Sequence, residues 1–131
     1  MPPVASLPTE RRAVVVVDDD RAVLNSLKFA LEIEGFAVRT YRSGEEFLAG
    51  ASLPQSACLV LDYHLPGVNG IAVMDELRRR HIEVPAILIT SNPPSALRQR
   101  AVAAGLALVE KPLLGNALSD AIHHALEPAG G

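Results

Sequence analysis

Short apolar runs alternate regularly with amphipathic helical patterns along this 131-residue chain, and this alternation strongly constrains the fold. Runs rich in β-branched and aliphatic residues predict strands at 13–17, 36–41, 58–61, 86–89 and 107–109. Helical spacing of apolar residues predicts helices at 21–34, after Ser43, at 71–81, at 95–104 and at 113–126. The run at 58–61 is apolar at every position, which is typical of a parallel strand covered by helices on both faces.

Strict alternation of strands and helices predicts an α/β fold. Each strand-helix-strand crossover is expected to be right-handed, so helices cover both faces of one parallel sheet. For a chain this short we expect a flavodoxin-like doubly wound (βα)5 fold with a five-stranded parallel sheet in the order 2-1-3-4-5. The ligand site of such a sheet lies at the carboxyl ends of its strands, near the switch point between the first and third strands.

The composition is that of an ordinary globular domain, with 49% hydrophobic and 21% charged residues. A formal net charge of −3 without a basic cluster argues against direct nucleic-acid binding. No segment approaches the roughly 20 apolar residues of a membrane span, and no secretion signal is evident, so we expect no membrane contact and a cytoplasmic location. Proline and glycine content predicts flexible ends at 1–11 and 128–131 around one domain at 12–127.

Acidic residues follow two predicted strands that are neighbours in the 2-1-3 order. Asp18 and Asp19 come directly after the first strand, and Asp62 comes after the third. Carboxylates this close disfavour one another's ionisation unless a cation joins them. Mg²⁺ is the natural partner, because it binds one or two carboxylates together with carbonyl and water oxygens. Asp20 stands where the first helix begins, so we interpret it as the helix N-cap rather than a metal ligand.

A hydroxyl and an ammonium group are expected at the same edge of the sheet. Thr90 follows the fourth strand, and Lys111 follows the fifth. A carboxylate surrounded by a metal, a hydroxyl and an ammonium group is suited to phosphoryl transfer, which needs mainly positioning and charge neutralisation. Asp62 is then the expected nucleophile, and the product is an aspartyl-phosphate.

Four motifs, each at the end of its expected strand, give the chain a family resemblance: "VVDDD", "LDYHLPGVNG", "LIT" and "EKP". Over about residues 12 to 127 it resembles the receiver domains of two-component response regulators, and it is most similar to receivers that precede helix-turn-helix output domains. The resemblance implies that Asp62 is the phosphoacceptor, assisted by Thr90 and Lys111. It also implies that Mg²⁺ is held by Asp19 directly, Asp18 through water, Asp62, and the backbone carbonyl of His64.

The resemblance implies a phosphorelay function. A sensor histidine kinase or a phosphotransfer protein donates the phosphoryl group, and the surface of the fourth helix, fifth strand and fifth helix then engages an unknown downstream protein. Such a domain is not an enzyme in the usual sense, although it can catalyse its own phosphorylation and dephosphorylation. Both a stand-alone regulator and a receiver fragment of a helix-turn-helix transcriptional regulator agree with the sequence.

Other hypotheses stay open. A small Mg²⁺-dependent phosphohydrolase with an aspartyl nucleophile is one, and a pseudo-receiver that is never phosphorylated is another. Homodimerisation through the last helix is a further hypothesis, because Ala117, Ala121 and Ala125 would permit close approach. One departure from the family is Leu108, which stands where receivers usually carry a Tyr or Phe that reports phosphorylation. We therefore expect an altered output surface.

Overall fold

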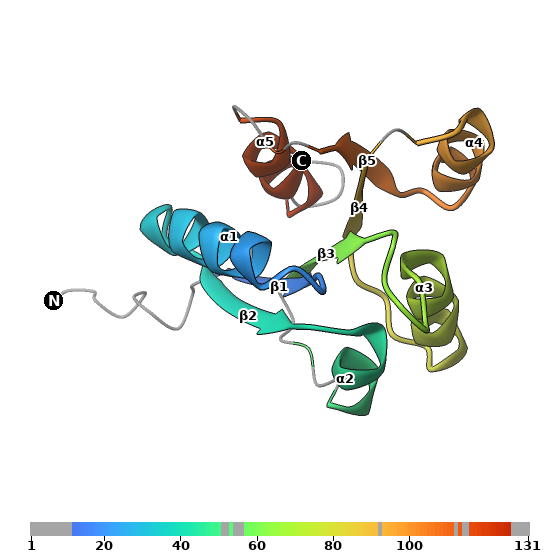
Figure 1. The fold of residues 1–131 in the computed structure, drawn as a ribbon, viewed down its shortest axis with the longest axis horizontal. Helices are drawn as coiled ribbons and strands as arrows, with labels where there is room; N and C mark the ends of the chain where they lie inside the picture. Colours follow the sequence, from blue (N-terminus) through green and yellow to red (C-terminus); the bar gives the residue numbers. More distant parts are fainter. Residues whose placement is uncertain are drawn as a thin grey trace, which may run out of the picture.

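A computed structural model of the chain describes residues 12–50, 53, 57–91, 93–111, 113 and 116–126, so the ends expected to be flexible, 1–11 and 128–131, lie outside the described residues. Strands and helices alternate throughout (Figure 1). The elements are β1 (Ala13–Val17), α1 (Arg21–Ile33), β2 (Ala37–Tyr41), α2 (Gly44–Ala49), β3 (Ala57–Asp62), α3 (Gly70–Arg79), β4 (Ala86–Thr90), α4 (Ser95–Ala103), β5 (Ala107–Glu110) and α5 (Ala117–Ala125). No helix of the described residues has the length and apolarity that crossing a bilayer requires.

The strands form one parallel sheet in the order β2-β1-β3-β4-β5, which confirms the predicted topology. In the central strands Val17 pairs with Leu61, and Leu61 pairs with Leu88. Helices α1 and α5 cover one face of the sheet, and α2, α3 and α4 cover the other (Figure 1). All five strands therefore end at the same edge of the sheet, where a ligand site is expected.

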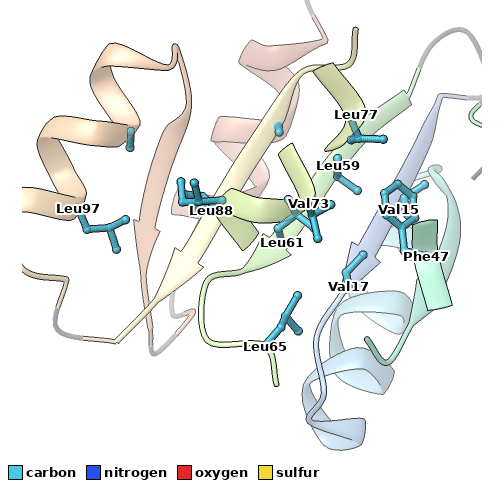
Figure 2. Packing of buried hydrophobic residues seen from close by; sticks show 13 residues of the cluster. Val15, Val17, Phe47, Leu59, Leu61, Leu65, Val73, Leu77, Leu88 and Leu97 are labelled. Carbon is cyan, nitrogen blue, oxygen red and sulfur yellow. The ribbon is translucent and has the colours of Figure 1, made fainter. Parts of the chain in front are cut away.

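Two apolar layers hold the helices on the sheet. Alternate residues of each central strand face opposite layers, as the period of two in a β-strand requires. Figure 2 shows the layer beneath α2, α3 and α4, which contains Val15, Val17, Phe47, Leu59, Leu61, Leu65, Ile71, Val73, Leu77, Ala86, Leu88, Leu97 and Ala101. The layer beneath α1 and α5 contains Val14, Val16, Leu24, Leu31, Phe36, Cys58, Val60, Ile87, Ile89, Leu118 and Ile122. Burial raises the pKa of the Cys58 thiol to about 12, so this cysteine is chemically inert at neutral pH.

The ends of α1 follow local sequence signals. The Asp20 side chain accepts hydrogen bonds from the backbone N–H groups of Ala22 and Val23, at 2.9 and 3.3 Å, which confirms the predicted N-cap. At the other end Gly35 has φ of +104°, and the Phe36 N–H donates to the Leu31 carbonyl at 3.1 Å. This is a Schellman motif, in which glycine takes the left-handed conformation that other residues avoid. This turn ends α1 and directs the chain into β2.

Several helix ends differ from the prediction. Helix α3 ends at Arg79 rather than 81, because His81 has φ of +60° and its N–H donates to the Arg78 carbonyl in a terminating turn. Helix α5 begins at Ala117 rather than 113, and Leu113 is not helical. The sequence Gly115-Asn116 disfavours helix continuation, which explains the later start. Leu114, which falls within the predicted helix at 113–126, lies outside the described residues.

Candidate functional site

Three carboxylates meet where β1 and β3 end side by side. Asp18 follows β1 directly, Asp19 is the next residue, and Asp62 is the last residue of β3. One carboxylate oxygen from each of the three lies within 4.8 Å of the others. Asp18 and Asp62 are buried, whereas Asp19 is exposed. The parallel register of β1 and β3 therefore places two buried acids and one solvent-facing acid in a single cluster.

Lys111 reaches this cluster from the far side of β4. Its backbone N–H donates to the Thr90 carbonyl at 2.8 Å, which continues the pairing of β4 with β5 by one residue. Its Nζ donates to Asp62 Oδ2 at 2.9 Å and lies 3.3 Å from Asp18 Oδ2, within ion-pair distance. The lysine side chain thus crosses the end of β4 and joins both buried carboxylates.

Backbone groups orient the other oxygen of each buried acid. The Asp20 N–H donates to Asp18 Oδ1 at 2.9 Å, and the His64 N–H donates to Asp62 Oδ1 at 3.0 Å. Asp18 Oδ2 is different, because this buried oxygen accepts no hydrogen bond from the described residues. A buried polar atom without a hydrogen bond is costly unless a nearby charge or a ligand compensates for it. The charge of this oxygen is balanced by the Lys111 ammonium group at 3.3 Å, and the oxygen keeps the capacity to accept a further ligand.

The electrostatics of the site oppose a full negative charge in the metal-free state. Burial raises the pKa of Asp18, and the nearby charge of Asp62 adds to the increase. Burial alone would lower the pKa of Lys111, but its hydrogen bond with Asp62 and the charge of Asp18 outweigh this effect and raise it. The ammonium group therefore stays protonated and partly neutralises the two acids.

Replacing Asp18 should stabilise the metal-free fold. Because the pKa of Asp18 is raised in the folded state, its ionisation costs stability as pH rises through that pKa. We expect Asp18→Asn to have a higher free energy of unfolding than wild type at neutral pH, by a margin that vanishes at pH values below the ordinary aspartate pKa. Urea unfolding in EDTA at several pH values measures this, and an equal or lower stability at neutral pH would contradict it.

The structure does not bring every predicted residue into contact. Thr90 is buried at the end of β4, but its hydroxyl points toward its own chain, with Oγ1 3.4 Å from the Ser91 carbonyl. His64 is exposed, and it contacts the site through its backbone N–H, which donates a hydrogen bond to Asp62 Oδ1. Asp20 caps α1, so the acidic triplet is divided between the cluster and the helix.

Gly70 is a site residue that sequence reasoning missed. A Cβ at this position would lie 3.1 Å from the Asp62 carbonyl oxygen and 3.0 Å from Leu88 Cδ2. The start of α3 therefore packs directly on the backbone that carries Asp62, and a larger residue at position 70 would require these neighbours to shift by a few tenths of an ångström. The available signal was the pair Asn69-Gly70, since Asn69 caps α3 by accepting from the Ala72 N–H at 2.9 Å.

Such a fold and site define a class of doubly wound domains with an acidic, lysine-bearing pocket at the carboxyl edge of the sheet. Residues 14–123 match the family model of the response regulator receiver domain. The chain belongs to this family, whose members are phosphoacceptor signalling domains of two-component systems and take phosphoryl groups from histidine kinases.

Individual relatives agree with this assignment. The chain is 35% identical over 115 residues to the transcriptional regulatory protein FixJ of Rhizobium meliloti (strain 1021), covering 87% of this chain and 56% of that protein. The solved structure of the response regulator StyR superposes with a TM-score of 0.81 at 35% identity, covering 88% of this chain and 59% of that one. The structure of FixJ-N gives a TM-score of 0.78 at 34% identity, covering 87% and 92%. The chain spans about half the length of the curated relatives it matches.

Proposed function

We propose that Asp62 accepts a phosphoryl group from a sensor histidine kinase or phosphotransfer protein in a Mg²⁺-dependent reaction. The observation that carries this proposal is the convergence of Asp18, Asp19 and Asp62, with Lys111 Nζ 2.9 Å from Asp62 Oδ2. In the transfer, an Asp62 carboxylate oxygen forms a bond to phosphorus while the bond from phosphorus to the donor histidine nitrogen breaks. The imidazole of the donor leaves with the electron pair and is then protonated.

The donor set fits a hard divalent cation. Three carboxylates can each supply an oxygen, and Asp18 Oδ2 is buried without a hydrogen-bond partner among the described residues. We propose that Asp19 binds Mg²⁺ directly, Asp18 binds it through water, and Asp62 and the His64 carbonyl complete the protein ligands. Bound there, Mg²⁺ neutralises negative charge on the acids and on the incoming phosphoryl oxygens.

Protein groups have separate tasks in this scheme. The His64 N–H holds Asp62 Oδ1, which sets the orientation of the nucleophile. Lys111 holds Asp62 Oδ2 and is placed to transfer its hydrogen bond to a phosphoryl oxygen. Thr90 must turn its hydroxyl away from the Ser91 carbonyl to bind the product. That bond is weak at 3.4 Å, so the rotation costs little.

The response to phosphorylation is proposed to reach the surface of α4, β5 and α5, where a downstream protein binds. Arg98 Nη2 on α4 lies 2.5 Å from Glu110 Oε1 on β5, so α4 is tied to the residue before Lys111. Leu108 is half-buried against the apolar layer beneath α4. An aliphatic side chain at this position cannot present a ring or hydroxyl, which supports an altered output surface. We place this function in the cytoplasm and in a domain at 12–127.

Labelling by a small phosphodonor tests the proposal. With acetyl phosphate and Mg²⁺ we expect intact-protein mass spectrometry to show one phosphoryl group per chain, and excess EDTA should reduce the labelling rate by about 100-fold or more. We propose that the domain itself catalyses this transfer of the phosphoryl group from acetyl phosphate to Asp62. Equal labelling in EDTA would contradict the Mg²⁺ requirement. Repeated turnover of a generic phosphomonoester, without a labelled protein, would favour the phosphohydrolase instead.

The names and lengths of the relatives support a second proposal. FixJ is named a transcriptional regulatory protein, and the present chain covers 56% of it. We propose that this receiver regulates transcription through a helix-turn-helix output domain. Sequencing the full reading frame around the gene tests this directly. A continuous frame encoding such a domain after residue 131 supports the proposal, and a stop codon there would contradict it in this form.

A further inference from the structure

We propose that the solvent face of α1 is a self-association surface, where α1 of a second copy of this chain binds in an antiparallel pair. Phe29 and Ile33 are 68% and 70% exposed, although they are large and apolar. They lie four residues apart and so share one helix face. The core uses the opposite face through Leu24 and Leu31, so packing within the domain does not account for these two side chains.

The exposed face has the spacing of a helix-helix seam. Ala22, Ser26, Phe29 and Ile33 follow one another at intervals of four, three and four residues. Apolar or small residues at these intervals form the contact stripe of paired helices. The side chains of this stripe are small in the first half of α1 and large in the second half. An antiparallel pair brings the partner's Ile33 opposite Ala22 and the partner's Phe29 opposite Ser26, so each large side chain meets a small one.

A hollow lies beside the small half of the stripe. It has a volume of about 420 Å³, and the residues that line it include Ala22, Val23, Ser26, Leu27 and Leu113. This lining is largely apolar and can receive large side chains from a second copy. A two-fold pair forms the same contact twice, because each copy supplies both a protruding half and a receiving half. The face is thus complementary to itself.

Charges along α1 also favour an antiparallel partner. Arg21 begins the helix, where no acidic residue occupies the first turn, and it has no ion-pair partner in the described part of the chain. The last turn carries Glu32, which pairs with Lys28 one turn earlier, and no basic residue. Glu34 follows the helix and contacts Ser119 and His123 of α5. In the proposed pair Arg21 lies beside the acidic end of the partner's α1. The helix dipoles are then also antiparallel, which is the favourable arrangement.

The predicted alternative, association through α5, is less well supported by the packing. Ala121 and Ala125 pack against the apolar layer that α1 and α5 share, so they serve the core of the domain. The area that a single helix pair buries is small compared with the roughly 1,200 to 2,000 Å² buried in stable complexes. The α1 dimer is therefore weak and depends on protein concentration.

Sedimentation equilibrium over a wide concentration range tests the proposal. We expect wild type to shift reversibly from monomer toward dimer, and Phe29→Glu to raise the dissociation constant roughly 30-fold or more, as for an interface hot spot. Val102→Glu is the matched control, because Val102 is 78% exposed on α4 and should leave the dissociation constant unchanged. Circular dichroism verifies that each variant is folded, and Ile33→Lys replaces Phe29→Glu if the latter is not.

Cysteine cross-linking tests the orientation of the two helices. Ala22→Cys protein mixed with Ile33→Cys protein should form disulfide-linked heterodimers, whereas Ala22→Cys protein alone should not cross-link. A wild-type protein that stays monomeric at all concentrations overturns the proposal. So does a dimer that Val102→Glu disrupts while Phe29→Glu does not, and efficient self-cross-linking of Ala22→Cys overturns the antiparallel arrangement.

Discussion

Replacing Asp62 with asparagine is expected to abolish phosphoryl uptake completely. Asparagine keeps the size of the side chain and can still accept from the His64 N–H, but it lacks the carboxylate oxygen that bonds to phosphorus. Because the proposed chemistry depends on that nucleophile, no second residue should replace it. Intact mass after incubation with acetyl phosphate and Mg²⁺ should show no labelled Asp62→Asn protein, under conditions that label wild type.

Asp75→Asn is the matched control for this experiment. Asp75 lies on α3, and its side chain is 66% exposed and 3.7 Å from Arg78. The same chemical change there should leave the labelling rate within about twofold of wild type, since surface substitutions away from a site have small effects. Labelling of Asp62→Asn at the wild-type rate would show that another residue is the phosphoacceptor.

Leu61→Ala is expected to have the largest effect on stability. Leu61 has no exposed surface, lies on the central strand β3, and pairs in register with Val17 on β1 and Leu88 on β4. Truncation leaves a cavity in a layer that the rigid sheet cannot close, which costs about 2–5 kcal/mol. This is a large fraction of the roughly 5–15 kcal/mol that stabilises a typical domain. Urea unfolding followed by circular dichroism measures the loss.

Leu106→Ala gives the same substitution at a half-buried position before β5. Less apolar surface returns to water there, and the neighbouring loop can relax, so the loss should be smaller by at least about 1 kcal/mol. Equal losses at the two positions would contradict the assignment of Leu61 to the core beneath Asp62. The two variants must be compared in EDTA, because bound Mg²⁺ would add stability to folded protein.

Much of the fold was predictable because the sequences of the buried strands have a distinctive apolar pattern. A run such as Val14–Val17 is apolar at each position, and this pattern is typical of a strand that is buried on both faces of the sheet. Strict alternation with helices then restricts the topology to a few doubly wound orders. The division of Asp18 to Asp20 between a cluster and a helix cap followed from the same boundaries, since Asp20 stands at the start of α1.

The remaining features depend on tertiary distances that periodicity does not encode. The pattern of α1 identifies Phe29 as apolar but not as exposed, because only packing decides which apolar stripe faces the sheet. Gly70 carries no hydrophobic signal, and its role appears only when α3 approaches the backbone of Asp62. Similarly, the Thr90 hydroxyl can rotate within a fixed backbone, so its bond toward Ser91 could not be predicted from its position.

The location of the phosphoryl group tests the central claim most directly. Borohydride reduces an aspartyl-phosphate to homoserine, and trypsin then separates the peptide at 13–21, which carries Asp18, Asp19 and Asp20, from the peptide at 43–78, which carries Asp62. Fragmentation of these peptides by mass spectrometry identifies the converted residue. We predict homoserine at position 62 alone. Conversion within 13–21, or at Asp75 in the second peptide, would contradict the assignment of Asp62 as the phosphoacceptor.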